Sequence, residues 1–178
     1  MIETERLVLR ELTFADAKDI YDVLTDEGVA RWGGIKPISS VEEAWAFVER
    51  CIDSFFIDIY GITEKGSDKV IGLVQIVERW FQRKSLGYCL AAKYRGKGYM
   101  TEAVRAVVPI LFEENPWLKA ILIEIFDGNE ASERVARKCG FFFDGMKMDV
   151  LSPYGNVEDE NHFSLTIGDY EWAKRKRA

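Results

Sequence analysis

The stretch that decides the fold is GYCLAAKYRGKGYMTEAV, residues 87–104. It reads as a strand, a loop in which one lysine separates two glycines, and the start of a helix. Gly96 and Gly98 permit backbone angles and close approaches that a side chain would block. Amides around these glycines can therefore point inward at the helix N-terminus, where an anion such as a pyrophosphate binds favourably. Arg95 and Lys97 add positive charge.

Two other phosphate-binding glycine loops do not fit this spacing. A P-loop requires GxxxxGK[ST], whereas the lysine here precedes the second glycine. A dinucleotide fingerprint requires GxGxxG, and Met100–Thr101 supplies no third glycine. The run RGKG alone is also compatible with a solvated turn, so the rest of the chain has to decide.

Outward from this loop, the apolar spacing predicts alternating strands and helices. Strands are expected at 6–12, 57–63, 70–77, 86–90, 118–126, 141–151 and 161–167. Helices are expected after Thr13, after Ser40, at 99–112 and at 129–139, the first two with acidic capping-box partners at Asp16 and Glu43. Pro109 should weaken or kink the third helix. Without a repeat or a linker, this order predicts one α/β domain, residues 1–178, on a mixed sheet.

Composition narrows the classes of function. The chain has 178 residues, 48% of them apolar, yet no apolar run approaches the ~20 residues that a membrane helix needs. Charges near the N-terminus leave no signal-peptide core, and three widely spaced cysteines suit reduced thiols, so we expect a cytoplasmic protein without membrane contact. The formal charge of −6 argues against nucleic acid as a partner and mildly favours amines or basic proteins. The basic end, AKRKRA, reads as a solvated helix terminus.

Residues 87–104 also resemble the GCN5-related N-acetyltransferase (GNAT) family, whose loop reads R/Q-x-x-G-x-G/A. This chain has Arg95 and Gly98 at the matching positions, and Met100 where Gly or Ala is usual. The second family motif, an Asn followed by a Ser and ending in Gly-Phe, is matched by NEASERVARKCGF. ETERLVLRELTFADA, YRGKGYMTEA and NHFSLTIGDYEW are similar to the RimJ/RimL branch, which acetylates the N-termini of ribosomal proteins. The resemblance therefore covers nearly the whole chain.

The resemblance implies a fold and a cosubstrate. The fold would be a mixed, mostly antiparallel sheet of about seven strands with helices on both faces, its fourth and fifth strands splayed to admit acetyl-CoA. A backbone N–H near Leu90 would face the thioester carbonyl as an oxyanion donor. Asn129 would bond the pantetheine arm, although it could equally be a plain helix N-cap. The expected cofactor-binding residues are Leu90, Ala91, Arg95, Gly96, Lys97, Gly98, Tyr99, Met100, Thr101 and Asn129. No metal is expected, because one histidine and scattered acids form no ligand cluster.

Proton transfer needs its own residues, because a neutral amine must attack the thioester and a protonated thiol must leave. Many GNAT enzymes use a Tyr at the position of Ala136 here. In the RimJ/RimL branch the proposed donor is the Ser of the Asn motif, which corresponds to Ser132; the alternative is a polar residue that satisfies local amides. Glu124, the lone acid within AILIEIF, is the candidate base if buried, and an ion pair or a sheet-end position is the alternative. Glu78 is a weaker candidate.

The remaining candidates keep two readings each. Cys89 would lie beside the thioester, but an inert core cysteine is the better interpretation. Trp32, Trp80 and Phe81 could line an acceptor cleft or simply pack. The acceptor would be a protein N-terminal amine, with a small amine (a polyamine or an amino sugar) as the alternative and a non-catalytic acyl-CoA sensor as a third reading. Assembly as a homodimer is left open.

Overall fold

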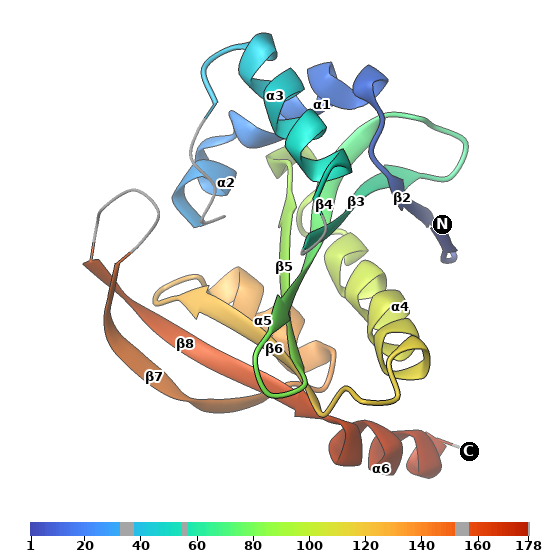
Figure 1. The fold of residues 1–178 in the computed structure, drawn as a ribbon, viewed down its shortest axis with the longest axis vertical. Coiled ribbons are helices and arrows are strands. Elements are labelled where there is room, and N and C mark those ends of the chain that lie inside the picture. Colours follow the sequence, from blue (N-terminus) through green and yellow to red (C-terminus); the bar gives the residue numbers. More distant parts are fainter. Residues whose placement is uncertain (33–37, 55–56, 152–156, 178) are drawn as a thin grey trace.

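One mixed, twisted sheet organises the computed structural model, which describes residues 1–32, 38–54, 57–151 and 157–177 (Figure 1). Its strands are β1 (Ile2–Glu3), β2 (Leu7–Glu11), β3 (Ile57–Glu64), β4 (Val70–Arg79), β5 (Arg83–Leu90), β6 (Ala120–Phe126), β7 (Phe142–Leu151) and β8 (Val157–Thr166). They lie in the order β1-β2-β3-β4-β5-β6-β8-β7. Every neighbouring pair is antiparallel except β5 with β6, which confirms the expected mixed and mostly antiparallel sheet.

Helices cover both faces of this sheet. They are α1 (Ala17–Leu24), α2 (Glu27–Trp32), α3 (Val41–Ile52), α4 (Tyr99–Glu114), α5 (Glu130–Lys138) and α6 (Ile167–Arg177), with short 3₁₀ turns η1 (Phe14–Asp16) and η2 (Ala92–Tyr94). Buried residues of α4 and α5 share one core cluster with β5, β6 and β8. Those of α1, α2 and α3 share a second cluster with β4 on the opposite face. The expectation from the family resemblance that helices lie on both faces of the sheet is therefore confirmed.

The sheet opens between β5 and β6. Their parallel pairing covers only Arg83–Ser85 against Ala120–Leu122. Beyond Ser85, β5 stays registered with β4 as far as Leu90, whereas β6 stays registered with β8 as far as Phe126. The strands therefore part in a V, as the family resemblance implies for its fourth and fifth strands. They carry the labels β5 and β6 here because the two-residue β1 adds an eighth strand to the sheet.

Local sequence signals explain most element boundaries. Both bonds of the Thr13–Asp16 capping box are present, and the Ser40 hydroxyl accepts the Glu43 amide at the start of α3. Helix α4 continues through Pro109, in the middle of its 16 residues. The apolar spacing from Val41 to Phe55 predicts one buried stripe on α3, but the stripe is only partly buried. Ala44 and Val48 are buried, whereas Trp45 is 48% exposed and stacks on Phe14; Phe55 lies outside the described residues.

Two helices were missed in the sequence reading. Helix α2 is only six residues long, too short for a 3.6-residue period to be visible. Helix α6 has charges on all sides, although its basic end was expected to be helical. The run RWGGIKP, residues 31–37, is typical of a turn. Its first two residues end α2, and residues 33–37 lie outside the described residues. Within the described ranges, no helix is both long and apolar enough to cross a lipid bilayer.

Candidate active site

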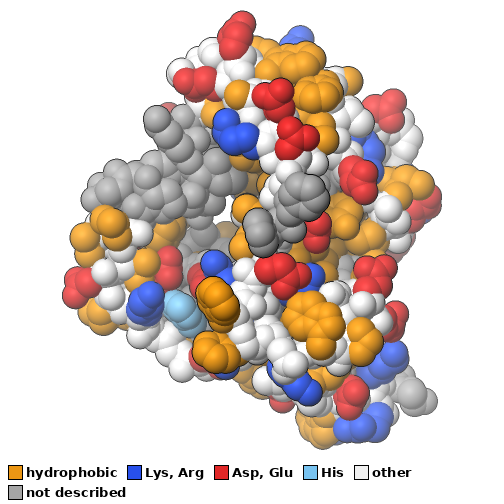
Figure 2. Space-filling model, in the orientation of Figure 1, with side chains coloured by type: hydrophobic (Ala, Val, Ile, Leu, Met, Phe, Trp, Pro, Cys, Tyr) orange, Lys and Arg blue, Asp and Glu red, His pale blue; other side chains and the backbone are white. Residues whose placement is uncertain are grey.

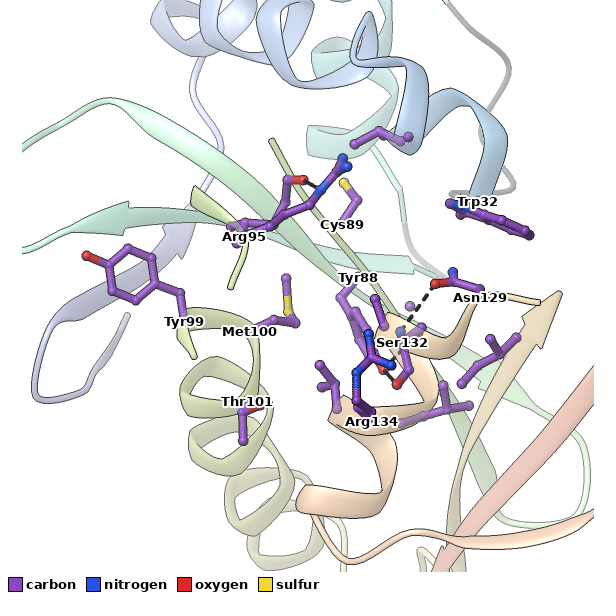
Figure 3. A pocket seen from close by; sticks show the side chains of 18 of the residues that line it. Trp32, Tyr88, Cys89, Arg95, Tyr99, Met100, Thr101, Asn129, Ser132 and Arg134 are labelled. Atoms are coloured by element: carbon purple, nitrogen blue, oxygen red, sulfur yellow. Dashed lines mark hydrogen bonds between the residues drawn. The ribbon is translucent and has the colours of Figure 1, made fainter. Parts of the chain in front are cut away.

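A cavity of about 430 Å³ fills the V between β5 and β6 (Figure 3). Its walls come from α2, β5, the glycine loop, the first turn of α4, β6 and α5. Ten of the residues singled out in the sequence line it: Leu90, Arg95, Gly96, Gly98, Tyr99, Met100, Thr101, Glu124, Asn129 and Ser132. Ala91 and Lys97 do not line it. Residues spread over some forty positions of sequence therefore meet at one site.

The glycine loop has the backbone expected of an anion site. Gly96 and Gly98 are both left-handed, with φ of 76° and 82°. Gly98 is the N-cap of α4 and has no side chain to cap the amides of Tyr99, Met100 and Thr101. These first-turn N–H groups have no carbonyl within the helix to pair with, so they are free to bind an anion. The structure thus gives the loop the geometry that a pyrophosphate requires.

Arg6, which precedes β2, holds this loop in place. Its guanidinium donates to the Lys97 carbonyl at 3.0 Å and forms an ion pair with Glu102 of α4 at 2.6 Å. Burial raises the pKa of Glu102, but hydrogen bonds from Thr4 and from the Arg6 backbone and side chain outweigh it and keep that pKa below its ordinary value. Glu102 therefore remains ionised, and the loop is tied to the edge of the sheet.

The positive charge of Arg95, which was expected to contribute to the anion site, is paired with a carboxylate. Its guanidinium is ion-paired with Asp26, and its Nε donates to the Leu90 carbonyl at 2.8 Å. Asp26 also accepts the Ala92 amide at 3.0 Å. Burial opposes ionisation of Asp26, yet the hydrogen bonds from Ala92 and Arg95 lower its pKa. Arg95 thus lines the cavity but mainly joins α2 to the end of β5, so its charge is largely neutralised before any phosphate binds.

Two other residues predicted to bind the cofactor, Lys97 and Ala91, have partners of their own. The Lys97 ammonium lies over the rings of Tyr94 and Tyr99, at 5.3 and 5.8 Å from their centroids, and Lys97 does not line the cavity. The Ala91 amide donates to the Ile71 carbonyl at 3.0 Å, so it is already used in the β4–β5 ladder. The loop consequently offers backbone amides more than side-chain charge.

The same ladder shows which amides of β5 face the gap. In an antiparallel pair, successive residues alternate between facing the partner strand and facing away. Since the Ala91 amide faces β4, the amide of Leu90 faces the other way, into the V, and so does that of Tyr88. An N–H at Leu90 is therefore oriented as the resemblance requires of an oxyanion donor.

Ser132, Tyr88 and Asn129 form a connected group on the α5 side of the cavity (Figure 3). The Asn129 side chain accepts the Ser132 amide at 3.2 Å, which is the N-cap role left open in the sequence. The Ser132 hydroxyl donates to the Tyr88 hydroxyl at 3.1 Å, and Tyr88 in turn donates to the Ser132 carbonyl at 3.1 Å. Burial raises the pKa of Tyr88 far above its ordinary value, so this phenol stays protonated. Tyr88 is thus a hydrogen-bond partner of Ser132 and a second hydroxyl that could protonate the thiolate. Tyr154, the other tyrosine that could serve if Ser132 does not, lies outside the described residues.

Glu124 is not the buried carboxylate that the apolar strand predicted. Its side chain is 29% exposed and forms an ion pair with Arg79 at 2.9 Å. The Ser85 hydroxyl donates to the same carboxylate at 2.9 Å. Ile123 and Ile125 point into the α4/α5 core, so Glu124 points to the opposite face of the sheet. The alternative reading of an ion pair is therefore correct, and Glu124 still lines the cavity.

The remaining candidates differ in whether they line the cavity. Cys89 lines the cavity, but burial raises the pKa of its thiol to about 12, which fits an inert thiol. Trp32 lines the cavity, whereas Trp80 and Phe81 are each 87% exposed at the β4–β5 turn and neither pack nor line it. Glu78 pairs with Lys84 at 2.6 Å, away from the cavity.

Two cavity residues were missed. Arg134 and Lys138 lie four positions apart on α5, so both face the cavity from one side of the helix. The signal was present in NEASERVARKCGF, in which two cations share that spacing beside the family motif. Within the described residues, no three His, Cys, Asp or Glu side chains gather closely enough to hold a metal ion.

Comparisons with known proteins agree with this geometry. A family model described as "Acetyltransferase (GNAT) domain" matches residues 6–142. The chain is 26% identical over 175 residues to the Uncharacterized N-acetyltransferase YoaA of Bacillus subtilis (strain 168), covering 93% of this chain and 96% of that protein. It is 26% identical over 117 residues to the ribosomal protein uS5-alanine N-acetyltransferase of Escherichia coli (strain K12), covering 66% and 60%. The crystal structure of the acetyltransferase (GNAT family) from Bacillus anthracis has a similar fold, with a TM-score of 0.83 at 22% identity over 93% and 97% of the two chains.

Proposed function

This chain belongs to the GNAT acetyltransferase family and is an N-acetyltransferase that uses acetyl-CoA, and from that premise we propose that its acceptor is the N-terminal amine of a protein. The observation that carries the proposal is the match to an enzyme named as an alanine N-acetyltransferase of ribosomal protein uS5. The RimJ/RimL-like segments at both ends of the chain support it further. The net charge of −6 suits a cationic acceptor, although acidic and basic side chains are interspersed on the face shown in Figure 2.

The two faces of the V would divide the substrates between them. The glycine loop and α5 lie on the same side as the α4/α5 core, so acetyl-CoA would enter there, its pyrophosphate on the first-turn amides of α4. The pantetheine arm would follow the Tyr88–Leu90 edge of β5, near Asn129. Glu124 points to the opposite face of the sheet, so the amine would approach the thioester from that side.

The chemistry then follows from these positions. The neutral amine nitrogen attacks the thioester carbon, and the carbonyl oxygen becomes negative while the Leu90 N–H donates to it. When this tetrahedral intermediate collapses, the C=O bond re-forms and the C–S bond breaks; the Ser132 hydroxyl protonates the leaving thiolate and regains a proton from water. Glu124 takes the proton of the amine through a water molecule. Acid and base thus act from opposite faces of the sheet on one reacting carbon.

The acceptor can be identified by thiol release from acetyl-CoA across a panel of peptides with different N-terminal residues, polyamines and amino sugars. Efficient turnover of one peptide class with weak turnover of small amines is the expected result. Preferred turnover of a polyamine or an amino sugar would replace the protein acceptor by a small molecule. Absence of acceptor-dependent turnover, with acetyl-CoA still binding, would favour a sensor.

The backbone amides of the glycine loop should contribute more to acetyl-CoA affinity than its charged side chains. We expect Gly98→Val to weaken acetyl-CoA binding at least tenfold, about 1.4 kcal/mol, because a β-branched residue cannot keep the φ of 82° that orients these amides. Lys97→Ala should have a smaller effect, since its ammonium is exposed and solvent-screened. Calorimetric titration of both variants measures this.

Gly66→Val provides a matched control for the strain. Gly66 has the same φ of 82°, with open space around it, in the β3–β4 turn far from the cavity. It should lose stability without losing affinity for acetyl-CoA. Parent-like binding in folded Gly98→Val would refute the loop assignment.

Activity should also survive prolonged treatment with a chelator. The amides of the loop suffice for the phosphate charge, and the reaction as written needs no Lewis acid. Turnover after exhaustive dialysis against EDTA, compared with turnover after readdition of zinc or magnesium, checks this. A loss that either metal restores would count against the mechanism.

A further inference from the structure

Three strands contribute to a closed hydrogen-bonded triangle beside the cavity. Arg79 is the last residue of β4, Ser85 lies in β5 and Glu124 in β6. The Arg79 Nε donates to the Ser85 hydroxyl at 2.9 Å, and an Arg79 terminal nitrogen donates to Glu124 Oε2 at 2.9 Å. The Ser85 hydroxyl closes the triangle by donating to the same Oε2 at 2.9 Å. We call these three residues the apex cluster.

The apex cluster sits where the V begins. Ser85 pairs with Leu122, and this is the last registered pair of β5 and β6 before the strands part. Glu124 lies two residues further along β6, on the same face as Leu122, just beyond the point where the strands part. Three residues of β6 line the cavity, namely Ile123, Glu124 and Ile125, and Glu124 is the ionisable one among them.

The bonding is also one-sided. Both described hydrogen bonds to the carboxylate use Oε2. A planar carboxylate that is fixed through one oxygen by two donors has its second oxygen fixed as well. Since Glu124 lines the cavity, Oε1 is the oxygen left to face the acceptor or its water.

We propose that Arg79 and Ser85 are positioning residues that hold the Glu124 carboxylate at the apex of the V, with one oxygen directed at the acceptor amine. This rests on the proposed function, in which Glu124 receives the amine proton. Neither residue touches the substrate; each acts through Glu124. Arg79 suits the task because its planar guanidinium spans two acceptors at once, which a lysine ammonium on a flexible stem would not hold in the same geometry.

A merely structural role is the competing explanation, because the same bonds join three strands. The two roles differ in a double-mutant cycle. If Arg79 acts through the Glu124 carboxylate, replacing Arg79 lowers kcat only in a protein that still has this carboxylate. If it merely holds the strands together, the effect persists when Glu124 is changed.

The experiment measures kcat and KM for the best amine, at saturating acetyl-CoA, in the full chain. We expect Arg79→Gln to lower kcat about tenfold with little change in acetyl-CoA affinity, since displacing a reacting group by a fraction of an ångström has effects of this order. Ser85→Ala should lower kcat about threefold, and Ser85→Thr, which keeps the hydroxyl, should stay near the parent. Arg83→Gln is the matched control: Arg83 is exposed, lies directly opposite Arg79 in the hairpin and should leave kcat unchanged.

The cycle decides the proposal. In a Glu124→Gln background, Arg79→Gln should have no further effect on kcat. A full, additive loss in that background, or parent-like kcat in folded Arg79→Gln, would overturn the positioning role while leaving the acetyltransferase assignment intact. Failure of the proposed base itself has a different signature, namely parent-like kcat in Glu124→Gln alone.

Discussion

Ser132→Ala is expected to lower turnover about 100-fold while acetyl-CoA affinity stays near that of the parent. General acids contribute roughly 10²–10⁴-fold, and the low end applies because a thiolate is a tolerable leaving group that water can partly protonate. The hydroxyl stabilises the thiolate only as it forms, so its loss affects the transition state and not the bound substrate. Single-turnover kinetics together with direct titration of acetyl-CoA separate the two quantities.

Tyr88→Phe refines this test, because the two hydroxyls are bonded to each other at 3.1 Å. If Ser132 is the donor, Tyr88→Phe should reduce turnover less than Ser132→Ala does. The reverse order, or parent-like turnover in Ser132→Ala, would transfer the acid role to Tyr88 or to water.

Asn129, one turn before Ser132, should give the opposite signature. Asn129→Ala should weaken acetyl-CoA binding, since its expected contact with the pantetheine arm exists already in the ground state. The structure adds that it should also destabilise α5, because the side chain caps that helix, by about 1 kcal/mol. Asn129→Ser keeps a capping oxygen without adding a charge, and it removes the amide group. Weaker binding in Asn129→Ser at parent-like stability would therefore isolate the cofactor contact.

The parts of the site that depend on local sequence were predictable. The glycine loop, the N-terminus of α4 and the Asn129 cap all follow from residues within a few positions of one another, so their backbone geometry can be inferred from spacing. The faces of β5 and β6 follow from two-residue alternation. The divergence of these two strands was implied only by the family resemblance.

The ion pairs could not be predicted in the same way. Asp26 and Arg95 are 69 residues apart, and Arg79 and Glu124 are 45 apart. Such partners meet only once the strand order and register are fixed, and neither follows from a local pattern. This is why Arg95 was expected to face the phosphate, and why the sequence left Glu124 open between a buried base and an ion pair. In each case the missing information was the partner from a distant strand or helix.

Glu124→Gln should lower kcat/KM for the amine about 100-fold near neutral pH, with acetyl-CoA binding unchanged. The amide is nearly isosteric and can still accept hydrogen bonds from Arg79 and Ser85, so the apex cluster keeps its shape while the proton acceptor is lost. The difference in kcat/KM between parent and variant should become smaller as the pH rises toward the pKa of the acceptor amine. At that pH more of the amine binds in its neutral form, so the reaction depends less on a general base. Measuring kcat/KM from pH 6 to pH 10 in parent and variant provides the comparison, with Glu78→Gln as the control carboxylate away from the cavity. If the ratio of parent to variant kcat/KM stays constant across that range, Glu124 binds or orients the acceptor through its charge or shape and is not the base. If kcat/KM is equal in parent and variant at pH 7, Glu124 has no role in the reaction.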